Sequence, residues 1–282
     1  MNYGKASSLT PEDFSTGYFN PGKPVIIMNT TKGWLAESSW RSQSELKKRY
    51  GDKHHFIGKL SPLSETNLRQ SKTMQEFLSY MTSATALNST FPDMLWEDIH
   101  SWVRYHQAHE RHPIEDTGVP EIIQGLAKLA GETFKTEVKS AAVSMGPACG
   151  GQTVTKKKDV FSALVAGLRY WVLDAKDLAT SDVENIAPND YIARLAKLRG
   201  DPWWTPSKTS RLLECTQREG EVLFVPRDRS QLVINLWPSA AVHHEFQLSE
   251  FEPAVATAPG DSNAASDAEG EAIADAQATL LV

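Results

Sequence analysis

Histidines are the residues in this sequence whose spacing most directly suggests metal chemistry. His106, His109 and His112 recur every third residue, but on an α-helix the outer two would lie about 120° apart around the axis. Three ligands on one helix face therefore fit poorly. The adjacent pairs His54-His55 and His243-His244 would point to opposite faces of a strand. These patterns predict surface or half-buried histidines and no metal site.

Cysteine chemistry is the second option that the residue types raise. Cys149 lies in a Gly-rich corner where a thiol could be exposed, but no histidine shares its segment to act as a base. Cys215 lies in a strand-like stretch and is expected to be buried. With only these two cysteines, the chain needs no disulfide framework, which fits a reducing compartment.

Two ordered stretches in the second half of the chain carry a more specific pattern. The first runs from Met145 to Asp174, MGPACGGQTVTKKKDVFSALVAGLRYWVLD, and the second is GEVLFVP from Gly220 to Pro226, which continues to Asn235. With the apolar strand 24–28 and the aromatic residues around it, they resemble the JmjC/cupin family of 2-oxoglutarate oxygenases. The resemblance is to the group that includes the asparaginyl hydroxylase of hypoxia-inducible factor.

The resemblance implies where the iron and 2-oxoglutarate of that family would bind. The three iron-ligand positions correspond to Thr155, Lys157 and Gln231, none of which is an ordinary iron ligand. A protonated lysine would also repel a dication. The family's 2-oxoglutarate lysine corresponds to Arg169, and Asn235 matches the family pattern. We therefore expect no catalytic residue, no metal and no cofactor. In the alternative in which the old pocket still binds an anion, the binding residues are Lys157, Arg169 and Asn235.

The side chain of Lys157 has a predicted direction. Lys157 and Thr155 are two residues apart and share one face of a strand, and the resemblance makes that face the inner one. A buried lysine needs a partner, and Gln231 on the facing strand is the expected one.

The elements that must position these residues follow from capping signals and periodicity. Spacings typical of capping boxes, and a proline at a first helical position, predict helices at 43–50, after Thr73, after Asp93 and from Pro120 onward. From Val138 short strands are expected over 139–145, 152–156, 162–173, 210–217, 221–225, 231–236 and 240–247. Helices followed by strands, without regular alternation, indicate the α+β class.

The predicted architecture is a JmjC/cupin double-stranded β-helix barrel with helical N-terminal decoration. It spans residues 1–250. Residues 251–282 are predicted to form an acidic low-complexity tail, because from Pro253 onward the sequence has five acidic residues and no Lys or Arg. Such a composition buries too little apolar surface to fold alone.

Charge and hydropathy exclude several classes of partner. The net charge is -6 over 282 residues, and without the tail the chain is near neutral and has no basic stripe, which argues against nucleic acid. No apolar run approaches the roughly 18 residues of a membrane span, and the N-terminus lacks a signal-peptide core. We therefore expect a cytoplasmic protein that is not secreted, and association with a large cytoskeletal or other assembly is left open.

The expected function is that of a catalytically inactive family member, a structural or protein-binding subunit of a multi-subunit complex. A homodimer is also left open. One alternative is a dicarboxylate sensor that uses the old 2-oxoglutarate pocket. Another is an Fe(II) and 2-oxoglutarate protein hydroxylase with unconventional ligands. The iron content of the purified protein separates the last alternative, and a screen of small dicarboxylates separates the other two.

Overall fold

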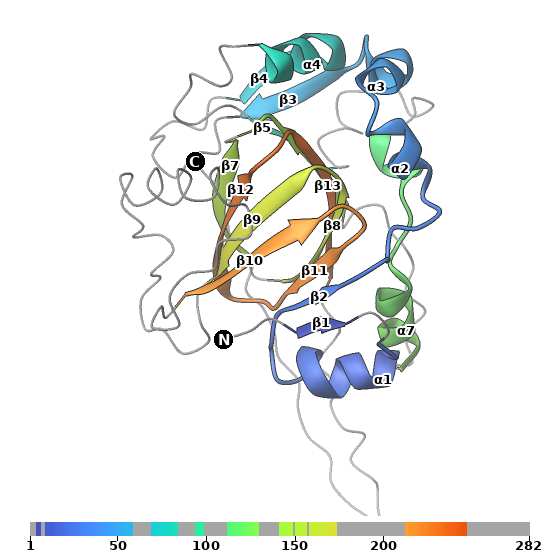
Figure 1. Cartoon of the computed structure of the whole chain (residues 1–282), viewed down its shortest axis with the longest axis vertical. Coiled ribbons are helices and arrows are strands. Elements are labelled where there is room, and N and C mark those ends of the chain that lie inside the picture. Colours follow the sequence, from blue (N-terminus) through green and yellow to red (C-terminus); the bar gives the residue numbers. More distant parts are fainter. Residues whose placement is uncertain are drawn as a thin grey trace, which may run out of the picture. The chain divides into compact units, whose positions relative to one another are not determined.

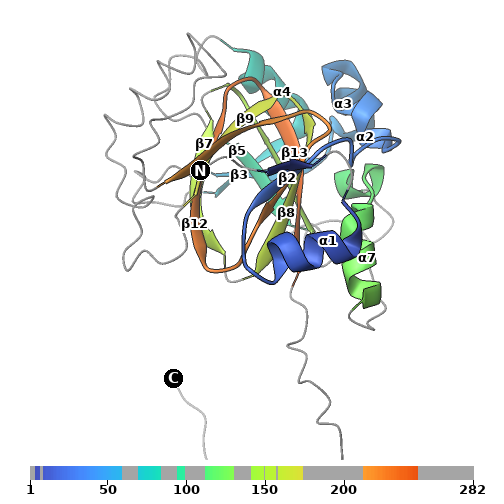
Figure 2. The same cartoon turned by 60° about the horizontal axis from the view of Figure 1, so that its bottom comes forward.

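The computed structural model describes residues 4–6, 9–58, 69–83, 94–98, 112–129, 141–148, 150–156, 158–173 and 212–246, with the backbone alone at 4–6, 56–58, 69–70, 94–98 and 152–156. Within these residues, two β-sheets face each other and enclose a barrel. Helices lie along the outside of the barrel (Figure 1, Figure 2).

The larger sheet has nine strands in the described residues, in the order β1-β2-β11-β8-β13-β6-β5-β3-β4. Its strands are β1 Gly4–Ala6, β2 Val25–Ile27, β3 His54–Gly58, β4 Arg69–Thr73, β5 Met94–Asp98, β6 Ala141–Gly146, β8 Asp159–Ala166, β11 Val222–Val225 and β13 Ser239–Phe246. The smaller sheet, ordered β10-β9-β12-β7, contains β7 Gly151–Lys156, β9 Leu168–Leu173, β10 Leu213–Arg218 and β12 Arg229–Asn235. The β1–β2 pair is parallel, and the other described pairs are antiparallel.

Helices cover the outer face of the larger sheet (Figure 1). Those described are α1 Pro11–Phe14, the π-helix η1 Ser15–Phe19, α2 Leu35–Ser39, α3 Gln43–Tyr50, α4 Met74–Thr82, the 3-10 helix η2 Pro113–Asp116 and α7 Glu121–Leu129. The predicted caps of α3 and α4 are confirmed: Ser42 and Thr73 each accept a backbone hydrogen bond from the third residue of their helix. The predicted start of α7 after Pro120 is confirmed as well.

Side-chain alternation divides each strand between the barrel interior and the helical layer. On β8, Val160 belongs to an apolar cluster between the two sheets, together with Trp171 and Val233 of the smaller sheet. The next residue, Phe161, lies on the opposite face and packs against Phe14 of α1. The barrel therefore has an interior of its own, separate from the core beneath the helices.

Two predicted elements are wrong. Residues 94–98 form β5 where a helix is expected after Asp93, because their backbone pairs with β3 and β6, and sheet pairing overrides the local helical periodicity. The single strand expected over 162–173 is two strands. Gly167 adopts a φ of 94° and turns the chain from β8 in the larger sheet to β9 in the smaller one.

Mixed helices and antiparallel sheets confirm the α+β class. The double-stranded β-helix winding is not established. Residues 247–282, with the predicted boundary at 250 and the acidic tail, lie outside the described residues, so both stay predictions. Among the described helices, none has the length and apolar character needed to cross a membrane.

Candidate anion-binding site in the barrel

Arg169 is a charged residue in the barrel interior. On β9 it alternates with Leu168 and Tyr170, so it lies on the same strand face as Trp171, which belongs to the interior cluster. Its backbone is paired with Asn235 of β12 on one side and Gln217 of β10 on the other. The side chain of Arg169 is completely buried.

The guanidinium of Arg169 reaches from the smaller sheet to the larger one. Its Nε donates to Ser239 Oγ of β13 at 2.9 Å, and its Nη2 donates to the carbonyl of Ser144 of β6 at 3.2 Å. Its Nη1 lies 3.4 Å from His243 Nε2. Three of its five N–H groups therefore have partners among the described residues, and none of these partners is a carboxylate.

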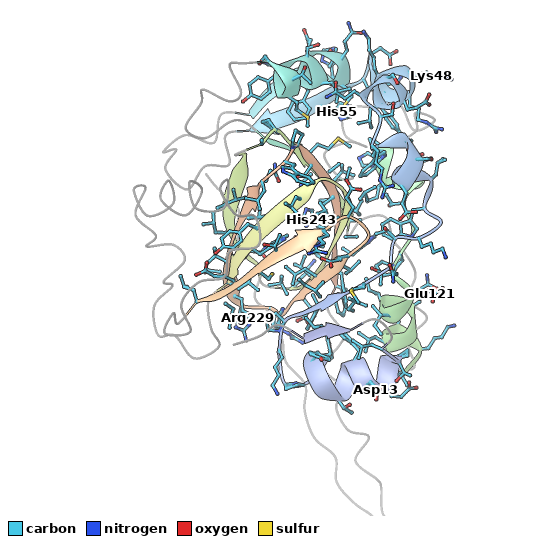
Figure 3. All side chains as sticks on the ribbon, in the orientation of Figure 1. Asp13, Lys48, His55, Glu121, Arg229 and His243 are labelled. Carbon is cyan, nitrogen blue, oxygen red and sulfur yellow. The ribbon has the colours of Figure 1, made fainter. Side chains whose placement is uncertain are left out.

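His243 and Ser144 form a neutral polar pair beside the guanidinium. Ser144 Oγ lies 2.7 Å from His243 Nε2, and His243 lies within the barrel in Figure 3. Because a guanidinium can only donate hydrogen bonds, Arg169 donates to His243 in the tautomer whose Nε2 is unprotonated. In that tautomer the imidazole is neutral, and Nε2 is the acceptor.

Asn235 holds this arrangement in place from β12. Its Oδ1 accepts from Ser239 Oγ at 2.5 Å, and its Nδ2 donates to the carbonyl of Pro147 at 3.3 Å. Since the Ser239 hydroxyl donates to Asn235, its lone pairs are left for Arg169 Nε. Asn235 therefore positions Ser239, and through it Arg169.

Burial dominates the electrostatics of Arg169. Desolvation lowers the pKa of its guanidinium to about 9, so the group remains a cation at neutral pH. A buried charge is costly unless it is paired, and the contacts of Arg169 within the described residues are neutral. This cation therefore favours binding of an anion.

Of the three expected iron-ligand positions, Gln231 is the one whose side chain the structure describes. It lies on β12, and its side chain is buried. The backbone register pairs Gln231 with Val154 of β7 and pairs Thr155 with Ser230. Thr155 and Gln231 are thus one step out of register and do not lie opposite each other. Lys157 lies outside the described residues, so its inward direction stays a prediction.

Among the residues that the structure describes, none forms the iron centre that the family resemblance implies. Within the described residues there is no group of three His, Cys, Asp or Glu side chains that could hold a metal ion. Neither residue of the paired positions Gln231 and Val154 is a histidine or a carboxylate.

The other candidate residues have structural positions. His112 caps η2, because its Nδ1 accepts from the backbone N–H of Ile114 at 3.0 Å. His106, His109 and Cys149 lie outside the described residues, and Cys215 is half-buried on β10. The alternation of the paired histidines is confirmed at His54, which is exposed, and His55, which is buried.

The expectation that the paired histidines are at most half-buried is wrong for His55, His243 and His244. Each is less than 7% exposed, because β3 and β13 are interior strands of the larger sheet. Ser144, Ser239 and His243 were not predicted as partners of Arg169. The alternation of His243-His244 was the available signal, since it places one of the two inside.

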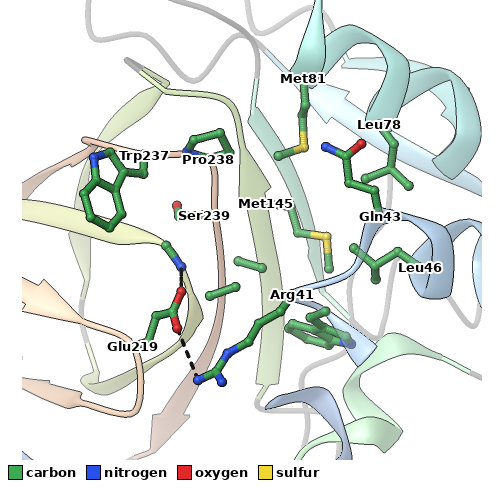
Figure 4. A pocket seen from close by; sticks show the side chains of 14 residues that line it. Arg41, Gln43, Leu46, Leu78, Met81, Met145, Glu219, Trp237, Pro238 and Ser239 are labelled. Carbon is green, nitrogen blue, oxygen red and sulfur yellow. Dashed lines mark hydrogen bonds and ion pairs between the residues drawn. The ribbon is translucent and has the colours of Figure 1, made fainter. Parts of the chain in front are cut away.

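A groove of about 300 Å³ lies between the helices α3 and α4 and the barrel (Figure 4). Its floor is apolar and includes Leu46, Leu78 and Met145. On its rim, the Glu219 carboxylate accepts from the backbone N–H of Gly167 at 2.8 Å and pairs with Arg41 at 3.2 Å. Both charges of the rim are thus matched, in contrast to Arg169.

The fold defines a barrel protein of the α+β class, with Arg169 buried in its interior. No family model matches the chain. The chain is 24% identical over 255 residues to the arginine-specific demethylase JMJ22 of Arabidopsis thaliana, with 87% of the chain and 46% of that protein covered. It is 25% identical over 260 residues to the bifunctional arginine demethylase and lysyl-hydroxylase psr-1 of Caenorhabditis elegans, with 85% and 59% covered.

These similarities confirm the resemblance to JmjC/cupin 2-oxoglutarate oxygenases. The chain spans about half the length of the curated relatives that it matches. The expectation that the chain is not an enzyme is contradicted, because both relatives are named for enzymatic activities and the family they indicate is an enzyme family. The residue types at positions 155, 157 and 231 do not by themselves establish a loss of activity.

Proposed function

We propose that the barrel binds a small dicarboxylate through Arg169. The observation that carries the proposal is a fully buried guanidinium with only neutral partners among the described residues. A carboxylate would supply the missing negative charge. It would also accept hydrogen bonds from the two remaining N–H groups, one on Nη1 and one on Nη2. Bonds between a guanidinium and a carboxylate are among the strongest that proteins form.

Neighbouring groups favour an anion without neutralising the arginine themselves. The Ser239 hydroxyl donates to Asn235 and accepts from Arg169 Nε, and His243 Nε2 accepts from Arg169 Nη1. Both orient the guanidinium and leave its charge in place. The resemblance supports the same ligand class, since Arg169 stands at the position of the 2-oxoglutarate lysine. Asn235 acts in this proposal as a positioning residue and Lys157 stays a predicted contributor.

The predicted protein partners are a separate matter. Membership of a multi-subunit complex, a structural or protein-binding role, and a homodimer are not tested by the fold or by the relatives. They stay predictions. A dicarboxylate site in the barrel is compatible with such roles and equally with an enzymatic one.

Thermal unfolding with glutarate, succinate or 2-oxoglutarate tests the proposal, with sodium chloride at matched ionic strength as the control for salt effects. A specific ligand at 100 times its Kd stabilises the fold by about 2.7 kcal/mol. Arg169→Met should abolish this shift. The matched control is Arg227→Met, which removes an arginine already paired with Asp159 and should leave the shift in place.

A second variant tests the charge argument directly. His243→Glu places a carboxylate beside Arg169, whereas His243→Gln has the same length without the charge. If Arg169 lacks a counter-ion, the Glu variant should be more stable than the Gln variant without ligand, and it should lose the dicarboxylate shift. Equal stability of the two, with the shift intact in both, would contradict the proposal.

A further inference from the structure

Gln231 has an unsatisfied hydrogen-bond acceptor inside the barrel. Its side chain is 3% exposed, and its carbonyl oxygen Oε1 is buried without a hydrogen-bond donor among the described residues. Buried polar atoms of this kind are uncommon because losing water without a replacement is costly. A ligand that brings a donor would satisfy this oxygen.

Gln231 and Arg169 face the same interior. Gln231 and Asn235 lie four residues apart on β12, so they share a strand face, and Asn235 is the backbone partner of Arg169. Along a strand, the Cα atoms of residues four apart are separated by about 13 Å. A five-carbon chain of ~6 Å with a hydrogen bond of ~2.9 Å at each end has a similar length.

The described side chains between the two polar ends are apolar. Trp171 and Leu173 of β9 and Val233 of β12 belong to the interior cluster. The backbone pair Val233–Trp171 lies between the pair Gln231–Leu173 and the pair Asn235–Arg169. A ligand that fits this sequence of environments has a carboxylate at one end, methylene groups in the middle and a hydrogen-bond donor at the other end.

We propose that Gln231 selects a dicarboxylate that carries a hydroxyl or ammonium group near its second carboxylate, in preference to a 2-oxo acid. The inference rests on the proposed function, because it assumes that Arg169 binds the first carboxylate. A hydroxyl or ammonium group can donate to Oε1 of Gln231. The oxygen of a 2-oxo group can only accept hydrogen bonds, so it leaves Oε1 of Gln231 unsatisfied. It also brings two acceptor oxygens, which repel each other, close together.

Calorimetric titration of the full chain with a matched series of ligands tests the inference. The series is glutarate, 2-oxoglutarate, 2-hydroxyglutarate and glutamate, which differ only in the group next to one carboxylate. We expect 2-hydroxyglutarate or glutamate to bind about tenfold more tightly than 2-oxoglutarate, the size of one net hydrogen bond. Tighter binding of 2-oxoglutarate than of either donor ligand would overturn the inference.

Gln231→Met tests the residue, since methionine keeps a similar length and removes the carbonyl. The variant should bind glutarate as the wild type does and should lose its preference for the donor ligands. Gln231→Leu is the second variant if the first does not fold. An unchanged ranking in a folded variant would show that Gln231 does not select the ligand.

The same titrations separate the two proposals. If glutarate and the other dicarboxylates all fail to bind, and Arg169→Met behaves like the wild type, the proposed function fails. If glutarate binds in a manner that depends on Arg169 but the donor groups confer no advantage, the dicarboxylate site stands and only the selection by Gln231 is overturned.

Discussion

His244 is a buried imidazole on the face of β13 opposite to His243. Its backbone partners are Ala141 of β6 and Phe161 of β8. Burial lowers the pKa of His244 from 6.5 to about 4, against a smaller opposing effect from its hydrogen bond with the backbone of Gly118. The folded protein therefore keeps this residue neutral where the unfolded chain would protonate it.

The stability of the fold should consequently depend on pH. The folded pKa is below the unfolded one, so this contribution is fully present above pH 6.5 and is lost as the pH falls from 6.5 to about 4. At ~1.36 kcal/mol for each pKa unit, the loss amounts to about 3 kcal/mol. Urea unfolding between pH 4 and 7.5 measures it.

A variant assigns this pH dependence to its residue. His244→Leu should flatten the stability profile between pH 4 and 6.5, because no titrating group remains at that position. His54→Gln removes an exposed histidine and should leave the profile unchanged. A profile equally steep in the His244 variant would mean that other groups cause the acid sensitivity.

At the scale of elements, the helix α4 begins with a complete capping box. Thr73 Oγ1 accepts from the backbone N–H of Glu76 at 3.2 Å, and Glu76 Oε2 accepts from the backbone N–H of Thr73 at 2.8 Å. These bonds to Thr73 hold the pKa of Glu76 below its usual value. At α3, Ser42 Oγ accepts from the backbone N–H of Glu45 at 3.3 Å, and the described contacts lack the reciprocal bond.

Thr73→Ala should therefore destabilise the fold by about 1–2 kcal/mol, the range for loss of a strong cap. Ser42→Ala should cost less, about 0.5–1 kcal/mol. Urea unfolding of both variants gives the comparison. NMR titration of Glu76 in the Thr73 variant should show its pKa moving toward the ordinary value. A cost for Ser42→Ala equal to or above that for Thr73→Ala would argue against the second bond.

At the scale of the whole molecule, Gly167 connects the two sheets. It has a φ of 94°, and an added Cβ would lie 2.3 Å from the Pro238 carbonyl oxygen and 2.7 Å from Ser239 Cβ. Gly33 has a similar φ of 88°, but a Cβ there would meet nothing within 4 Å. Substitution of Gly33 therefore measures the backbone strain alone, and substitution of Gly167 measures the same strain together with steric crowding.

Gly33→Ala should cost about 1–2 kcal/mol from the left-handed backbone conformation alone. Gly167→Ala should cost a further ~1–3 kcal/mol for overpacking against β13, and should weaken binding at Arg169, whose partner Ser239 is displaced. Urea unfolding and dicarboxylate titration of both variants check this. Equal costs at the two glycines would show that the crowding is relieved without penalty.

The local signals in the sequence predicted the elements that depend on local chemistry. The caps at Ser42 and Thr73 mark the helices α3 and α4, because a cap involves residues only three apart. The resemblance of 145–174 and 220–235 to JmjC/cupin proteins predicted the barrel and the position of Arg169. Those features could be read without the tertiary structure.

Tertiary structure decided which residues meet. Residues 94–98 are a strand because β3 and β6 pair with them, and no local pattern encodes partners that lie so far along the chain. The register of β7 with β12, which pairs Gln231 with Val154 instead of Thr155, is set by the whole barrel in the same way. Ser144 comes from β6 and both Ser239 and His243 come from β13. Only closure of the larger sheet over the smaller one gathers these two strands around Arg169.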